Sequence, residues 1–295
     1  MSHVLVRTFA GVVAAAAAVV GLTAAASPAH PRPHPQPPVG VGADYLALGD
    51  SVSFGYREPA SLPTPDYHDA ATFVGYPEDV AADLGLHVAN AACPGETSAS
   101  LIDATAPSNG CEATGSTPGY RTLYPLHVSY TGSQLDYAVH YLRTHRQTRL
   151  VSLMIGANDA FVCEKSTADK CVSEFPAVLA EISRNVTTIL RAIRHEARYV
   201  GQLVIVNYYS LDYADPVQAA QSQALNQAMD SAARPFHTVV ADGFGAFQRA
   251  AAQTSGNVCA AGLITVLSTG GCGIHPSVAG QMLLAGAVER VVRKR

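Results

Sequence analysis

The chain has 295 residues, of which 48% are hydrophobic, and a formal net charge of -4. This apolar content suffices for one sizeable core, in one domain or at most two. The mild acidity argues against nucleic acid or an anionic membrane surface as the main partner, because a strongly basic surface is the usual mark of proteins that bind them.

The first 26 residues predict a secretory signal peptide. Arg7 precedes an almost wholly apolar run from Phe9 to Val20, and three alanines at 24–26 offer small residues for cleavage. An uncleaved membrane anchor is the alternative, because residues 9–26 are nearly long enough to span a bilayer. We therefore expect secretion, to the medium or the cell envelope, with cleavage near Ala26.

A proline-rich segment follows and predicts an extended linker over residues 27–42. It begins SPAHPRPHPQPP, and proline at this density builds neither helix nor sheet. His30 and His34 in this segment are potential metal ligands, but a plain linker is the better interpretation. The folded domain is predicted over residues 43–295.

Six cysteines in an exported chain predict disulfides. Short separations along the chain favour three local pairs: Cys93–Cys111, Cys163–Cys171 and Cys259–Cys272. Because no Cys-x-x-Cys pair stands with a matching histidine pair, structural zinc is a poor fit. No metal or other cofactor is predicted.

Short apolar runs alternate with amphipathic segments through the rest of the chain. Strands are predicted at 44–48, 87–91, 149–155, 203–207 and 238–241, and helices at 73–84, 133–144, 175–195, 217–233, 246–252 and 277–292. This alternation predicts an α/β fold, in which helices cover both faces of a parallel sheet. In such sheets, functional residues gather at the carboxyl ends of the strands.

Four segments near predicted strand ends contain the residue types needed for acyl transfer. They are GDS at 49–51, ACPGETS at 92–98, GAND at 156–159 and GIHP at 273–276. In acyl transfer a hydroxyl attacks a carbonyl, an imidazole takes its proton, and N–H donors hold the developing oxyanion. We therefore expect the four segments to converge on one edge of the sheet.

These segments resemble the SGNH hydrolase family, also called GDSL esterases and lipases. GDSVSFG is similar to the first family block, NAACPGETS to the second, IGAND to the third and IHPS to a shortened fifth. The Cys-Pro-Gly context and the three cysteine pairs look most like the secreted actinobacterial branch. The resemblance implies a flavodoxin-like three-layer α/β/α sandwich with a mainly parallel five-stranded sheet, and hydrolysis of acyl or lipid esters without a metal.

By the same resemblance, Ser51 corresponds to the nucleophile and His275 to the general base. The oxyanion hole would consist of the backbone N–H groups of Ser51 and Gly95 and the side-chain amide of Asn158. Ser53 is interpreted as a hydroxyl bonded to nearby backbone. Neither serine fits Gly-x-Ser-x-Gly, which argues against an α/β-hydrolase elbow. Activity is expected to rise with pH as the imidazole loses its proton.

One position departs from the family's pattern. Cys272 replaces the acid that usually stands three residues before the histidine. Two acceptors for the far ring nitrogen of His275 remain open: the backbone carbonyl of Cys272, which we favour, and the carboxylate of Asp242. A neutral carbonyl orients the ring but stabilises imidazolium less than a carboxylate does.

Two long loops, 57–72 and 104–132, are expected to shape substrate choice. Tyr120, Tyr124 and Tyr130 in the second loop either line an acyl groove or are ordinary packing. We expect a monomer acting on a small-molecule or lipid ester, which is compatible with transient contact with lipid or the cell envelope. The alternatives are a carbohydrate deacetylase or acyltransferase on the same residues, and a non-catalytic cell-envelope binding domain.

Overall fold

The computed structural model describes residues 36–295. The predicted signal peptide and residues 27–35 of the predicted linker lie outside the described residues. Within residues 36–295, no helix has both the length and the apolar character needed to cross a bilayer.

The folded unit begins earlier than the predicted boundary at Ala43. Val39 is buried and forms an isolated β-bridge with Lys294, and the Gln36 side-chain amide donates to the backbone oxygen of His237 (2.8 Å). The last residues of the predicted linker therefore belong to the folded unit, because Val39 removes its apolar side chain from water there.

Five parallel strands form the central sheet in the order β2–β1–β3–β4–β5. Each agrees with a predicted strand to within about one residue at either end. Strands β1, β3 and β4 are buried almost throughout, as a parallel sheet covered on both faces requires. The bounds are β1 Asp44–Gly49, β2 His87–Asn90, β3 Thr148–Met154, β4 Gln202–Val206 and β5 Val239–Ala241.

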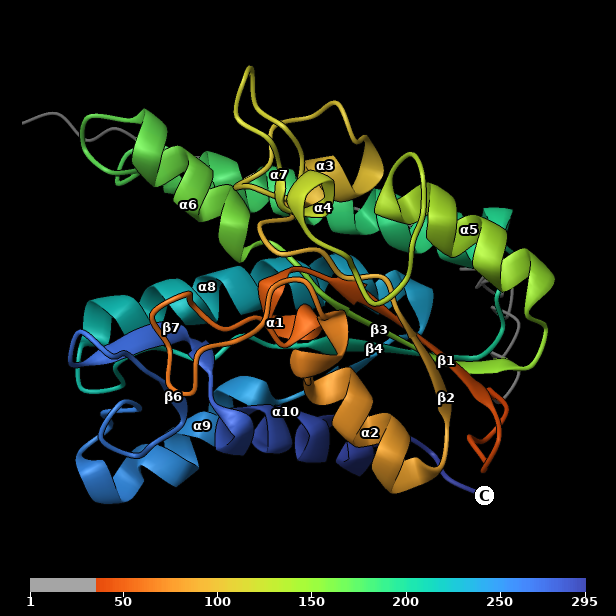
Figure 1. Cartoon of the computed structure of the whole chain (residues 1–295). Coiled ribbons are helices and arrows are strands. Elements are labelled where there is room, and N and C mark those ends of the chain that lie inside the picture. Colours follow the sequence, from red (N-terminus) through yellow and green to blue (C-terminus); the bar gives the residue numbers. More distant parts are fainter. Residues whose placement is uncertain (1–35) are drawn as a thin grey trace, which may run out of the picture. The chain divides into compact units, whose positions relative to one another are not determined.

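Helices cover both faces of this sheet, so the predicted three-layer α/β/α architecture is confirmed (Figure 1). One face carries α3, α5, α6, α7 and α8, and the other carries α2, α9 and α10. The bounds are α1 Ser51–Phe54, α2 Tyr76–Leu84, α3 Ser98–Ile102, α4 Tyr120–Leu123, α5 Gln134–Thr144, α6 Ala157–Ser166, α7 Phe175–Arg191, α8 Pro216–Ala233, α9 Gly243–Ala250 and α10 Val278–Val291.

Three predicted helices differ from the observed ones. The helix predicted over 246–252 begins at Gly243, because Asp242 caps it there. The helix predicted from residue 73 begins at Tyr76, because Phe73 is extended and packs its ring against Phe54 (centroids 5.3 Å apart). The helix predicted over 175–195 keeps its buried apolar stripe, but its last turn, Ala192–Glu196, is a π-helix.

A small second sheet, which is not among the predicted elements, lies beside the active site. Strands β6 (Ile264–Val266) and β7 (Cys272–Pro276) form an antiparallel hairpin, with Val266 opposite Cys272. The Cys259–Cys272 disulfide anchors this hairpin. The other two disulfides also join the expected partners, Cys93–Cys111 and Cys163–Cys171.

Candidate active site

Ser51 is the first residue of α1, directly after β1 at the carboxyl edge of the sheet. Asp50 caps this short helix by accepting the backbone N–H of Val52 (2.9 Å). Gly49 allows the tight turn between strand and helix, since it has φ 146° and a Cβ there would collide with the carbonyl oxygen of Met154. The turn and the helix cap therefore fix the backbone position from which the Ser51 side chain projects.

His275, on β7, meets Ser51 across a separation of 224 residues in the sequence. The two side chains are joined by a hydrogen bond of 3.0 Å between His275 Nε2 and Ser51 Oγ. The Tyr56 ring packs edge-on against the imidazole, with centroids 4.8 Å apart. The 3.0 Å distance between Nε2 and Oγ is within the range for proton transfer from hydroxyl to imidazole.

The other ring nitrogen of His275 has a partner that differs from both expectations. Nδ1 lies 2.8 Å from Oε1 of Glu58. The predictions of the Cys272 carbonyl or the Asp242 carboxylate at this position are therefore wrong. Asp242 instead caps α9 by accepting the backbone N–H of Gly245 (2.7 Å), and its carboxylate is largely exposed beside Arg249.

Glu58 is a well-satisfied, mostly buried carboxylate. Oε1 also accepts the backbone N–H groups of Ile274 (2.7 Å) and His275 (3.2 Å), and Oε2 accepts the hydroxyl of Thr265 (2.5 Å). Burial by itself raises the pKa of Glu58, but the hydrogen bond and charge of His275 and the other donors outweigh it and lower the pKa to about 2. The carboxylate is therefore ionised at any pH near neutrality.

The expected oxyanion donors lie close by. Gly95 has φ 85°, and a Cβ there would lie 2.7 Å from the carbonyl oxygen of Asn109. Within residues 36–295, the backbone N–H groups of Ser51 and Gly95 donate to no protein acceptor. The Asn158 amide donates to the backbone oxygen of Glu96 (3.0 Å) and accepts from the Asn109 amide (2.7 Å), which fixes its orientation.

All four sequence-predicted residues line one cavity of about 730 Å³. Part of it extends between α6 and α8. Each helix contributes residues at the three- and four-residue spacing of one helical face: Ala157, Ala160, Phe161 and Glu164 from α6, and Gln218, Gln221, Ser222 and Leu225 from α8. Tyr120 lines this cavity, whereas Tyr124 and Tyr130 line a separate hollow of about 190 Å³.

A comparison with protein families matches residues 47–283 to the GDSL-like lipase/acylhydrolase family. The chain belongs to this family. It is therefore a carboxylic ester hydrolase with the SGNH fold. A search of curated proteins finds no match.

Solved structures similar to this GDSL hydrolase include two of Axe2, an acetylxylan esterase from Geobacillus stearothermophilus. One is 18% identical with a TM-score of 0.50, and covers 85% of this chain and 94% of its own. The other, a catalytic mutant of the same enzyme, is also 18% identical, with a TM-score of 0.55 and the same coverage. At this identity the likeness supports the fold.

Buried carboxyl groups surround the site of this GDSL hydrolase. Burial raises the pKa of Asp50 to about 6, although the Tyr208 hydroxyl and the Val52 N–H donate to it. Burial likewise raises the pKa of Glu96 to about 7, against the opposing effect of hydrogen bonds from Ser100 and Gln134.

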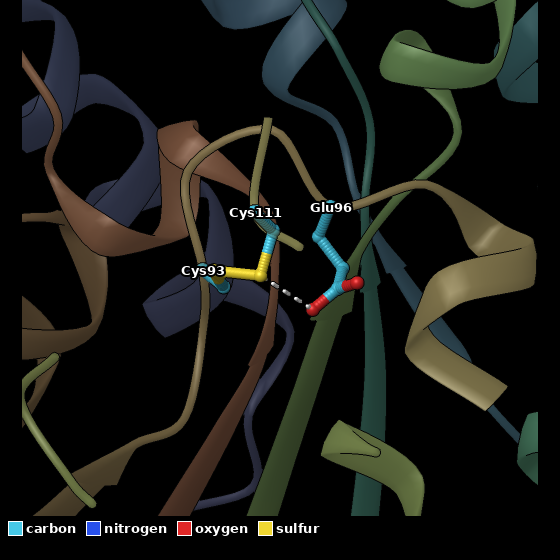
Figure 2. A group of neighbouring side chains, drawn as sticks. All are labelled: Cys93, Glu96 and Cys111. Carbon is cyan, nitrogen blue, oxygen red and sulfur yellow. Dashed lines mark hydrogen bonds between the residues drawn. A yellow bond between two sulfur atoms is a disulfide. The ribbon is translucent and has the colours of Figure 1, made fainter. Parts of the chain in front are cut away.

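Figure 2 shows Glu96 turned toward the disulfide between Cys93 and Cys111, with its Oε2 lying 3.5 Å from the Cys111 sulfur. These three side chains lie close enough together to hold a metal ion. Both sulfurs are joined to each other, however, and a metal needs thiolates. In the oxidised protein this group is therefore a disulfide packed on a buried carboxyl group.

Proposed function

We propose that the enzyme is a secreted serine esterase or lipase that hydrolyses acyl or lipid esters through an acyl-enzyme on Ser51. The observation that carries the proposal is the 3.0 Å contact between Ser51 Oγ and His275 Nε2 inside the cavity. As Oγ attacks the ester carbonyl, His275 takes its proton and passes it to the leaving alcohol. Water then attacks the acyl group by the same route, which releases the acid and restores Ser51.

The oxyanion of each tetrahedral intermediate is assigned to three donors. Two are the backbone N–H groups of Ser51 and Gly95, which donate to no acceptor within residues 36–295. The third is the Asn158 side-chain amide, whose second hydrogen has only a long contact of 3.5 Å with Asp50. Preorganised donors stabilise the negative charge of the transition state without having to reorient, and this is the main source of their catalytic effect.

Secretion is part of the proposal and is supported by the cysteines. All six are paired, in three disulfides, within the described residues. Such bonds form and persist in oxidising compartments and are rare in the cytosol. The predicted signal peptide gives the route of export, and the resemblance to the secreted actinobacterial branch agrees with it.

A carbohydrate deacetylase is the second candidate, and the α8 wall of the cavity favours it. Gln218, Gln221 and Ser222 offer amide and hydroxyl groups there, which suit a polyhydroxylated alcohol. The similarity in fold to acetylxylan esterases points the same way.

Release of nitrophenol from acyl esters tests the proposal, with the S51A variant as control. Turnover by the unmodified enzyme should exceed that of S51A by at least about 10³-fold. Equal rates would instead support a non-catalytic binding domain. A series from acetyl to long acyl chains, run beside acetylated xylo-oligosaccharides, then separates deacetylase from lipase.

A further inference from the structure

We propose that Glu58 is the positioning carboxylate of this active site, giving a Ser51–His275–Glu58 triad. The carboxylate comes from the loop after the nucleophile, whereas the family's usual acid stands three residues before the histidine. The inference rests on the serine-esterase function proposed above. It assigns Glu58 two tasks: to hold Nδ1 of the imidazole protonated and in place, and to balance the charge of the imidazolium formed during attack.

The hydrogen bonds of the Glu58 carboxylate all lead to the hairpin that carries His275. Thr265 lies on β6, and Ile274 and His275 lie on β7, and each donates to the carboxylate. Glu58 thus bridges both strands. Its hydrogen bond to Nδ1 leaves Nε2 unprotonated and able to accept the Ser51 hydroxyl, which is the tautomer that a general base needs.

Gly273 indicates that this space is kept for the carboxylate. A Cβ at position 273 would overlap both Glu58 Oε1 and Thr265 Oγ1. The glycine does not have a positive φ, so its backbone conformation is open to other residues. Glycine at position 273 therefore serves to leave room for the Glu58 carboxylate.

The loop that delivers Glu58 is fixed to the same hairpin by its backbone. Ser61 forms a β-bridge with Leu267, the Leu62 N–H donates to the Val266 oxygen (2.9 Å), and the Ser268 N–H donates to the Ala60 oxygen (2.7 Å). The carboxylate is therefore held in place before substrate binds, as a positioning residue requires.

The other titratable groups near this pair cannot take over its role. Burial raises the pKa of the Tyr56, Tyr67 and Tyr209 phenols, which remain neutral at working pH. Asp50 acts on His275 through its charge, but its hydrogen bonds go to Tyr208, Val52 and Asn158 and not to the ring. Glu58 is the carboxylate that contacts the imidazole.

The first test replaces the carboxylate with its neutral isostere. In E58Q the amide can donate to Nδ1 and hold the imidazole in the wrong tautomer. We expect kcat to fall by about 10²- to 10⁴-fold, with KM within about threefold. D242N, which changes the other carboxylate considered, should keep activity within about threefold.

A second variant moves the carboxylate without removing it. G273A keeps every proposed catalytic group but forces Glu58 away from Nδ1, so it should reproduce the kcat loss of E58Q. A far-downfield imidazole Nδ1–H resonance in histidine-labelled protein, lost in both variants, gives a readout that needs no activity. Thermal unfolding of each variant confirms that the compared samples are folded.

The outcomes separate this inference from the proposed function. If S51A destroys activity while folded E58Q and G273A keep kcat within about threefold, Glu58 only braces the hairpin and the inference is overturned. A native spectrum without the downfield proton also overturns it. If the unmodified protein has no esterase activity but shows the resonance, the hydrogen bond exists and the proposed function fails instead.

Discussion

Asn158 shows how one residue is prepared for its proposed role by its neighbours. Only 5% of the residue is exposed, and its amide is oriented from two sides by Asn109 and by the backbone of Glu96. An amide held in this way loses little freedom when it meets a developing oxyanion. Its value should therefore appear in the transition state and not in the binding of substrate.

We expect N158A to lower kcat by about 10²- to 10³-fold with KM within about threefold. Steady-state kinetics on a short-chain nitrophenyl ester measures this, with the N109A variant beside it. N109A keeps the donor and loses only one of its supports, so its defect should be much smaller. A rise in KM with unchanged kcat would place Asn158 in substrate binding.

Gly95 carries a different constraint, which comes from its own backbone. Its φ of 85° is costly for other residues, and a Cβ would press on the Asn109 carbonyl. We expect G95A to lose both stability and turnover. Thermal unfolding and kcat measure these two effects. A G95A protein with native melting temperature and activity would contradict the interpretation that position 95 requires glycine.

At the scale of elements, the sheet and the hairpin differ in how well the sequence predicts them. The five parallel strands are apolar runs, and such runs can be recognised directly in the amino-acid sequence. The hairpin strands are short, and the segment between and within them contains Gly270, Gly271 and Gly273. The hairpin is defined by the pairing of its two strands, by its disulfide and by the loop that docks on it. Of these three features, only the disulfide can be inferred from sequence.

The same difference explains which site residues could be predicted. Ser51, Gly95 and Asn158 each follow a strand of the parallel sheet, so topology alone brings them together. Glu58 stands in a proline-rich loop, 217 residues before the histidine that it contacts. Nothing in its local pattern distinguishes it from a surface acid, and its role depends on a hairpin that the sequence does not reveal.

The hairpin should couple the Cys259–Cys272 disulfide to catalysis more closely than the Cys163–Cys171 disulfide. Cys272 lies on β7 with His275, whereas Cys163 and Cys171 tie the end of α6 to the following loop. Each bond should contribute about 2–4 kcal/mol to stability. We expect C259S/C272S to lose more kcat than C163S/C171S at a temperature where both are folded. The reverse order would contradict this coupling.

For the molecule as a whole, buried acids set the dependence of stability on pH. The pKa of Glu58 is lowered from 4.5 to about 2, so its contribution is present above pH 4.5 and is lost as the pH falls toward 2. Burial raises the pKa of Asp50 and Asp159 to about 6 and of Glu96 to about 7. The folded state therefore binds more protons than the unfolded state between about pH 4 and 7, and stability falls as the pH rises through that range.

We accordingly expect the melting temperature to be higher near pH 5 than at pH 8, and to decline again below pH 4. Calorimetry across this range measures it. In E96Q one of these groups no longer titrates, so the decline between pH 5 and 8 should be shallower. A melting temperature that rises steadily from pH 5 to 8 would show that ionisation of these carboxyl groups does not destabilise the folded protein.

The order of the site residues along the chain has a consequence for biosynthesis. The nucleophile leaves the ribosome 224 residues before its general base. An unfinished polypeptide therefore contains a serine that cannot be activated.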